Sequence, residues 1–191
     1  MQPTREQTLE LLQKYNQNPG LIKHALAVEA TMRHFARHFN EEEEKWGVIG
    51  LIHDLDYEQY PEQHCTMTKQ ILEENNWPGD YIRAVLSHGW QICTDIKPET
   101  LLEKTLYTID ELTGLVTTSA LVRPSKSILD MKAKSVKKKW KDKRFAAKID
   151  RTIIERGAEM LDMELSQIIT LTIEGMATIA DQLELDGRLA D

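Results

Sequence analysis

The segment Trp46 to Leu55 is apolar nearly all round, and it contains an adjacent histidine and aspartate, His53 and Asp54, close to its end. A helix that is apolar on every side must be buried, so the segment predicts a central helix with other helices packed around it. Gly50 would let one of those helices approach closely. Two ionisable side chains at the end of such a helix are costly unless they are paired or bind a metal ion.

The rest of the chain also favours helices, because nine glycines and six prolines are few helix-breaking residues for a chain of 191 residues. Apolar residues recur at helical spacing almost throughout, and no internal repeat is evident. We therefore predict an all-α fold. The expected helices cover about residues 4–15, 21–39, 41–55, 61–74, 80–88, 98–117, 147–160 and 164–184.

Composition restricts the classes of function that this chain can have. No stretch of about 18 apolar residues occurs, so no transmembrane helix and no membrane partner are expected. The polar N-terminus lacks the apolar core of a signal peptide, and the two cysteines are best explained as reduced thiols, which predicts a cytoplasmic protein. The net charge of −7 argues against broad nucleic-acid binding.

Of the three histidines in the second expected helix, only one can face inward. His24 lies at the edge of the apolar stripe of the segment 21–39 when residues are placed about 100° apart. His34 points nearly opposite to that stripe, and His38 lies well off it. We therefore expect His34 and His38 to be solvated surface residues.

Three more polar side chains lie on the apolar faces of later helices, namely His64, His88 and Asp110. Burial of each polar group without a partner costs roughly 2–7 kcal/mol of folding free energy, so these residues would destabilise an ordinary hydrophobic core. A shared metal would relieve the cost for all of them. The predicted metal ligands are His24, His53, Asp54, His64, His88 and Asp110.

The order His…His-Asp…His…His…Asp resembles the HD-domain superfamily of metal-dependent phosphohydrolases. The resemblance covers about residues 20–117 and includes the segments 51–56 and 110–114. It implies an HD-type helical bundle over residues 1–120, with a C-terminal helical extension over 121–191 that packs on the same domain. The additional motifs of the HD-GYP subgroup are not evident, so specificity for cyclic dinucleotides is not supported.

The resemblance also implies how the ligands are divided. His24, His53, Asp54 and Asp110 would hold a first metal ion, and His64 and His88 would hold a second, with Asp54 bridging the two. Imidazole and carboxylate ligands suit Fe, Mn, Mg, Ni or Zn. One or two such ions could activate a water molecule as hydroxide for attack on phosphorus, with His53 and Asp54 as the catalytic pair.

The expected activity is therefore hydrolysis of a phosphomonoester or phosphodiester in a small phosphorylated metabolite or nucleotide. Two alternatives stay open. Some proteins with this ligand order are di-iron oxygenases, such as those resembling myo-inositol oxygenase, and the spacing cannot separate the two reaction classes. The metal could also be structural, in a non-catalytic regulatory module.

Several features outside the ligand set are open to two interpretations. Asp56 could orient a ligand histidine or a water molecule, but we favour a surface carboxylate at a helix terminus. Cys65 is placed about 100° round the expected helix from His64, which favours a small buried thiol over a metal ligand, and Cys93 is interpreted in the same way.

The C-terminal part contains a basic segment, residues 132–144, with seven lysines and one arginine. We favour a solvated helix face for it, with a phosphate-binding wall as the functional alternative. The substrate-binding candidates are Arg123, Lys126 and Lys132. The last expected helix, 164–184, is apolar enough to pack on a second copy of the chain, as a homodimer, or on its own domain.

Overall fold

The computed structural model describes residues 2–190, and this part of the chain is all-α, with no β-sheet. The helices are α1 (Arg5–Tyr15), α2 (Pro19–Phe39), α3 (Glu43–Ile52), the short 3-10 helix η1 (Pro61–Gln63), α4 (Thr66–Glu74), α5 (Gly79–Ser87), α6 (Leu101–Leu121), α7 (Ala133–Trp140), α8 (Arg151–Leu161) and α9 (Leu165–Ala177). The predicted all-α fold class is confirmed.

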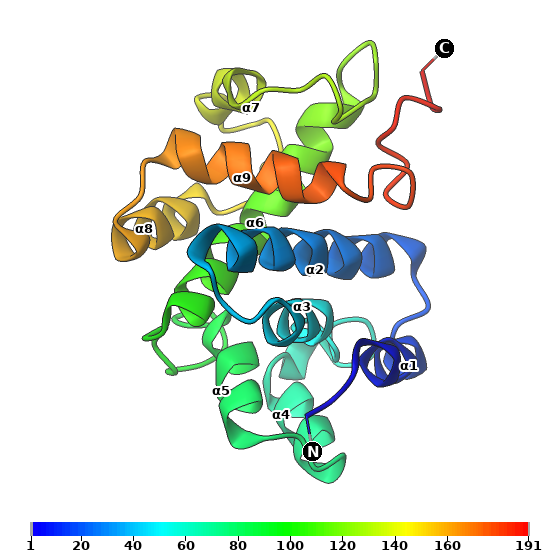
Figure 1. Cartoon of the computed structure of the whole chain (residues 1–191), viewed down its shortest axis with the longest axis vertical. Coiled ribbons are helices and arrows are strands. Elements are labelled where there is room, and N and C mark those ends of the chain that lie inside the picture. The colour runs from blue at the N-terminus through cyan, green and yellow to red at the C-terminus, as the bar shows by residue number, and fades with distance from the viewer. Residues whose placement is uncertain (1, 191) are drawn as a thin grey trace.

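Helix α2 lies at the centre of the molecule. It packs against α3, α6 and α9, and Figure 1 shows α1, α3, α4 and α5 on one side of it and α7, α8 and α9 on the other. Its start is set by Asn18, whose side chain accepts a hydrogen bond from the backbone N–H of Gly20 at 2.8 Å. Its end is set by Asn40, which adopts the left-handed conformation that stops a helix.

The helix expected at the centre corresponds to α3; all of its residues from Trp46 to Ile52 are buried, but the central position belongs to α2. A Cβ atom at Gly50 would lie 2.8 Å from Cγ of Met32 on α2, so glycine at this position permits the close contact of the two helices. The helix ends at Ile52 rather than Leu55. His53 and Asp54 therefore occupy its C-terminal edge, where the chain turns.

The C-terminal residues pack on the same core as the rest of the chain. Helix α8 packs against α6, and α9 packs against α2 and α6. One hydrophobic cluster contains Val28 and Leu112 together with Ile154 and Ile169. The apolar face of α9 is thus covered by its own chain, and that face no longer argues for a homodimer.

Two expectations about the helices need correction. The helix expected from Pro61 onward is a 3-10 turn followed by α4, so His64 precedes α4 instead of lying on a helical face. Within the basic segment, a short helix, α7, carries mostly exposed lysines, as the favoured interpretation expected. Helix α9 ends at Ala177, and the chain then folds back, with the backbone N–H of Ile128 donating to the carbonyl of Leu185 at 2.8 Å.

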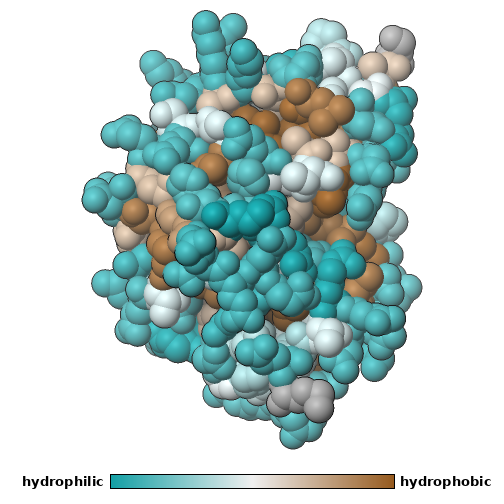
Figure 2. All heavy atoms as spheres, viewed as in Figure 1, coloured by the Kyte–Doolittle hydropathy of each residue, from teal (hydrophilic) through white to brown (hydrophobic). Residues whose placement is uncertain are grey.

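Within residues 2–190, no helix is both long and apolar enough to cross a membrane. Figure 2 shows that hydrophilic side chains cover most of one face of the molecule, with hydrophobic side chains visible mainly between them.

Candidate metal centre

The six predicted ligands come together in one place, which we call the His/Asp cluster. Two groups of side chains within it have ligand atoms less than 4.8 Å apart. The first group comprises His24, His53, Asp54 and Asp110, and the second comprises Asp54, His64 and His88. They come from α2, the C-terminal edge of α3, the turn before α4, the end of α5 and the middle of α6.

In the first group, His24 is the centre of the contacts. Its Nε2 atom lies 3.0 Å from Oδ1 of Asp110 and 3.2 Å from Nε2 of His53. Oδ2 of Asp54 lies 3.7 Å from Nε2 of His24 and 3.4 Å from Nε2 of His53. Ligands that one ion holds at about 2.1 Å lie roughly 3 to 3.5 Å from each other, and these spacings are close to that range.

In the second group, the Nε2 atoms of His64 and His88 lie 3.2 Å apart. Oδ1 of Asp54 lies 3.5 Å from Nε2 of His64 and 3.3 Å from Nε2 of His88. Asp54 therefore directs one carboxylate oxygen to each group. Asp54 could therefore contribute a ligand atom to either group.

The hydrogen bonds to the Nδ1 atoms determine which ring nitrogen of each histidine faces the cluster. Nδ1 of His53 donates to the carbonyl of Gly50 at 2.8 Å, and Nδ1 of His88 donates to the carbonyl of Val85 at 2.5 Å. A carbonyl oxygen only accepts, so each Nδ1 carries the proton and each Nε2 presents its lone pair.

The remaining two histidines have the same orientation. Nδ1 of His64 lies 2.7 Å from Oδ1 of Asp56. Nδ1 of His24 lies 3.4 Å from the hydroxyl of Thr113, which donates its own proton to the carbonyl of Asp110 and so accepts from the histidine. Four Nε2 lone pairs thus face one another and two carboxylates, which is favourable only with a cation or protons between them.

The electrostatics of the cluster agree with this arrangement. Burial alone would lower the pKa of His53, but the carboxylates of Asp54 and Asp110 outweigh burial and raise it well above its usual value. Burial would raise the pKa of both carboxyl groups, but His53, with His88 at Asp54 and His24 at Asp110, holds each below its usual range. The site therefore favours a positive charge among its imidazoles and carboxylates.

One side of the cluster is open to solvent. The side chains of His53 and His88 are 0% and 3% exposed, whereas those of His24, Asp54 and Asp110 are 24%, 19% and 22% exposed. Beside them, burial and the Asp110 carboxylate raise the pKa of Glu111 to about 7. A small molecule could therefore reach the carboxylates from the solvent side.

Asp56 corrects an expectation. It is fully buried rather than a surface carboxylate, and it accepts hydrogen bonds from Nδ1 of His64 and from the backbone N–H of Thr68 at 2.8 Å. It therefore orients a predicted ligand, which is the alternative that the sequence left open. Its position two residues after Asp54 was the available signal.

The two outer histidines of α2 differ from each other. His38 is exposed, as expected. His34 is only 23% exposed, and its Nε2 lies 3.2 Å from a carboxylate oxygen of Glu174, because α9 covers this side of α2. His34 is therefore partly covered, whereas a fully solvated side chain was expected.

The substrate-binding candidates form no hydrogen bond or ion pair with the His/Asp cluster among residues 2–190. Arg123 pairs with Asp130 at 2.6 Å and bonds to the hydroxyl of Ser135 at 3.0 Å. Lys126 is half-buried in the following turn, and Lys132 is exposed before α7. Their role in phosphate binding stays a prediction.

A cation that sequence reasoning missed is Arg156 on α8. Its guanidinium bonds to Oε1 of Gln91 at 2.6 Å and to the hydroxyl of Tyr107 at 3.0 Å, and it lies over the ring of Trp90. No carboxylate pairs with it among residues 2–190. Tyr107 precedes Asp110 by one helical turn, but no pattern in the sequence indicated this contact.

Comparison with known proteins gives no match to a family model, to a curated protein or to a solved structure. The fold and the site define an all-α protein with a His/Asp cluster that could hold a metal ion. Assignment of its function depends on the chemistry of that cluster.

Proposed function

We propose that the chain is an HD-type, divalent-metal-dependent phosphohydrolase that acts on a small phosphorylated metabolite or nucleotide. The observation that carries this proposal is the position of Asp54, with one oxygen facing each of two histidine groups. Two divalent ions bridged in this way form a common site for phosphate-ester hydrolysis. The order of the ligands along the chain is the one that the family resemblance implies.

Divalent ions in the two groups would supply Lewis acidity toward a phosphoryl oxygen and would activate water as the nucleophile. The chain would contribute the positions of the ligands. His53, held by the carbonyl of Gly50, presents its Nε2 atom from the buried side, and Asp56 fixes the ring of His64. The partly exposed carboxylates of Asp54 and Asp110 would form the side on which the phosphate approaches.

A cavity next to the cluster is the proposed space for the rest of the substrate. It has a volume of about 390 Å³, has His24 in its wall, and is otherwise lined largely by α6 and by the C-terminal segment around Leu183 and Leu185. Ligand sites are usually about 300–1,000 Å³. Another cavity, of about 380 Å³ around Lys14 and Trp77, has no residue of the cluster in its wall.

We also propose that the protein acts in the cytoplasm, since both cysteines are free thiols. A small phosphorylated substrate suits the size of the cavity beside His24.

Metal content and activity test the proposal together. Protein purified without added metal should contain one or two equivalents of a divalent ion by elemental analysis, and the His53→Ala/Asp54→Ala variant should lose them. Hydrolysis of a panel of phosphate esters with Mn²⁺ or Mg²⁺ should fall at least about 100-fold in that variant. Activity that survives both substitutions would refute the proposal.

A matched pair on α2 controls for damage to the fold. His24→Ala removes a half-buried cluster residue, and His38→Ala removes an exposed histidine on the same helix. Only His24→Ala should lose metal and activity. Two equivalents of iron with oxygen consumption would instead favour the oxygenase alternative, and metal without turnover on any substrate would favour a structural role.

A further inference from the structure

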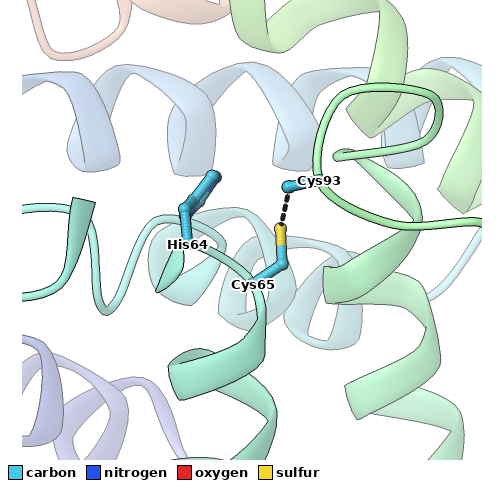
Figure 3. Close-up of side chains that lie close together, drawn as sticks. All are labelled: His64, Cys65 and Cys93. Atoms are coloured by element: carbon cyan, nitrogen blue, oxygen red, sulfur yellow. Dashed lines mark hydrogen bonds between the residues drawn. The ribbon is translucent and has the colours of Figure 1, made fainter. Parts of the chain in front are cut away.

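The two cysteines of the chain meet beside the second group of the His/Asp cluster. The sulfur atoms of Cys65 and Cys93 lie 2.6 Å apart, closer than two unbonded sulfur atoms usually approach. Figure 3 shows that Cys65 points toward Cys93, while the neighbouring His64 side chain projects separately from the same turn. The pair therefore links the segment that contains His64 to the loop that follows His88.

The backbone holds both sulfur atoms in this position. Cys65 has a φ of 68°, which is unusual for a residue with a side chain and persists only where its surroundings fix it. On the other side, the backbone N–H groups of Cys93 and Thr94 donate to the carbonyl of Gly89 at 2.9 Å and 3.0 Å. The loop is thereby fastened to the end of α5, directly after His88.

Gly89 makes room for the pair. A Cβ atom at this position would lie 2.3 Å from Sγ of Cys93 and 2.7 Å from Sγ of Cys65, which no side chain could tolerate without a shift. Cys65 directly follows the predicted ligand His64. Gly89, which leaves space for the two sulfur atoms, directly follows the predicted ligand His88. The contact between the two sulfur atoms therefore joins the same two segments that carry His64 and His88.

A thiolate-bound metal ion explains this geometry less well than a disulfide. His64, Cys65 and Cys93 have ligand atoms close enough to hold an ion. However, Nδ1 of His64 is bonded to Asp56 and Nε2 faces His88, so neither ring nitrogen is available to a separate ion. The two sulfur atoms have no such competing contacts.

We infer that Cys65 and Cys93 form a reversible disulfide upon oxidation by a hydroperoxide, and that this bond fixes the two segments that carry His64 and His88. The consequence for the metal rests on the proposed function, but the disulfide itself does not. Because the sulfur atoms are already in contact, the bond requires little movement of the backbone. Oxidation therefore preserves the second group and restrains it.

The reaction proceeds in two balanced steps. The half-exposed Cys93 sulfur attacks hydrogen peroxide, the O–O bond breaks, and a sulfenic acid and one water molecule form. The buried Cys65 sulfur then attacks the sulfenic sulfur and displaces a second water molecule, leaving the S–S bond. Two electrons pass from the thiols to the peroxide, and a small-molecule dithiol returns them by exchange.

Mapping of the thiols tests the modification without any assumption about function. The chain has only two cysteines, so the treated protein should be lighter by two hydrogen atoms and should resist alkylation. Peptide mapping should show one Cys65–Cys93 link that dithiothreitol reverses. The variants Cys65→Ser and Cys93→Ser should each keep one thiol that forms no link within the chain. Two alkylated thiols, overoxidised cysteines or links between chains after peroxide treatment would overturn the inference.

Release of metal tests the consequence. Mn²⁺-loaded protein is diluted into a chelator, and the second ion should leave about tenfold more slowly from oxidised than from reduced protein, because the bond preorganises two ligand segments. The first ion should leave at the same rate in both states, and Cys93→Ser should show no dependence on oxidation. If the disulfide is mapped but the second ion leaves oxidised and reduced protein at equal rates, the inferred restraint of the second group is refuted.

Two further outcomes are distinguishable. If neither the wild-type protein nor the cysteine variants bind metal, the proposed function is refuted. The disulfide is then judged from the thiol mapping alone. If reduced protein binds one more Zn²⁺ equivalent than the Cys65→Ser/Cys93→Ser variant, the thiols are metal ligands and the disulfide inference is overturned.

Discussion

At the scale of single residues, Asp56 determines how His64 can act. It is fully buried, and its two oxygens accept from a ring N–H and a backbone N–H. This leaves the Nε2 lone pair of His64 directed at the second group. A side chain that touches no metal in the proposed site thus decides whether a ligand is in its binding form.

Replacement of Asp56 by asparagine should weaken the second ion selectively. The amide oxygen can accept from Thr68, but the amide nitrogen then donates toward Nδ1 of His64 and forces the ring proton onto Nε2. We expect a loss of about 10–100-fold in affinity for the second ion, measured by calorimetric titration with Mn²⁺, and an unchanged first site. Asp95→Asn alters an exposed carboxylate and serves as the control. Equal affinity in both variants would show that Asp56 does not position His64.

Which residues gather at the cluster was predictable from the sequence, but their bonding was not. Residue type and expected inward position selected six side chains from five segments, although His64 lies in the turn before α4 rather than on the helical face expected for it. The hydrogen bonds between Asp56 and Thr68 and between Arg156 and Gln91 join residues 12 and 65 positions apart in the chain. Such contacts leave no periodic pattern, so they could not be found in this way.

At the scale of helices, the crossing of α2 and α9 depends on a small residue. A Cβ atom at Gly175 would lie 2.8 Å from the backbone Cα of Thr31 and 3.2 Å from the carbonyl oxygen of Ala30. These are backbone atoms of α2, so they cannot rotate away as a flexible side chain could. The helices would have to separate.

Gly175→Ala should therefore destabilise the protein. Alanine favours a helix over glycine by up to about 1 kcal/mol, but overpacking of a tight contact costs roughly 1–3 kcal/mol, so we expect a net loss of about 1–2 kcal/mol. The midpoint of urea unfolding measures it. Gly79→Ala is the matched control, because no atom lies within 4 Å of its added Cβ. A Gly175→Ala variant at least as stable as the wild type would show that the helices can adjust.

The positions of the longer helices followed from apolar spacing and capping residues, but their ends shifted where the sequence gives weak signals. Periodicity extends the last helix to 184, whereas α9 stops at Ala177 and the chain turns back, so that the carbonyl of Leu185 accepts from the backbone N–H of Ile128. The same tertiary packing half-buries His34, which α2 alone would leave in solvent. Spacing within one helix cannot show what another helix covers.

At the scale of the whole molecule, the cluster connects the parts of the fold. Its residues come from α2 and α6 and from the segments around α3, α4 and α5. Helices α8 and α9 in turn pack against α2 and α6. In the absence of a cation, its Nε2 atoms and carboxylates repel one another at about 3 Å. A bound ion would therefore stabilise the native chain as well as the site.

Removal of metal should consequently lower the melting temperature. An ion that binds only the folded chain adds about 2.7 kcal/mol at a concentration one hundred times its Kd, and 1 kcal/mol shifts Tm by about 2–4 °C for a chain of this size. We therefore expect Mn²⁺ to raise Tm by roughly 5–10 °C over chelator-treated protein in differential scanning calorimetry. His24→Ala should lose most of that shift, and His38→Ala should retain it, since only His24 faces the carboxylates. An equal Tm with and without Mn²⁺ in the wild type would mean that the cluster balances its charges with protons and holds no ion.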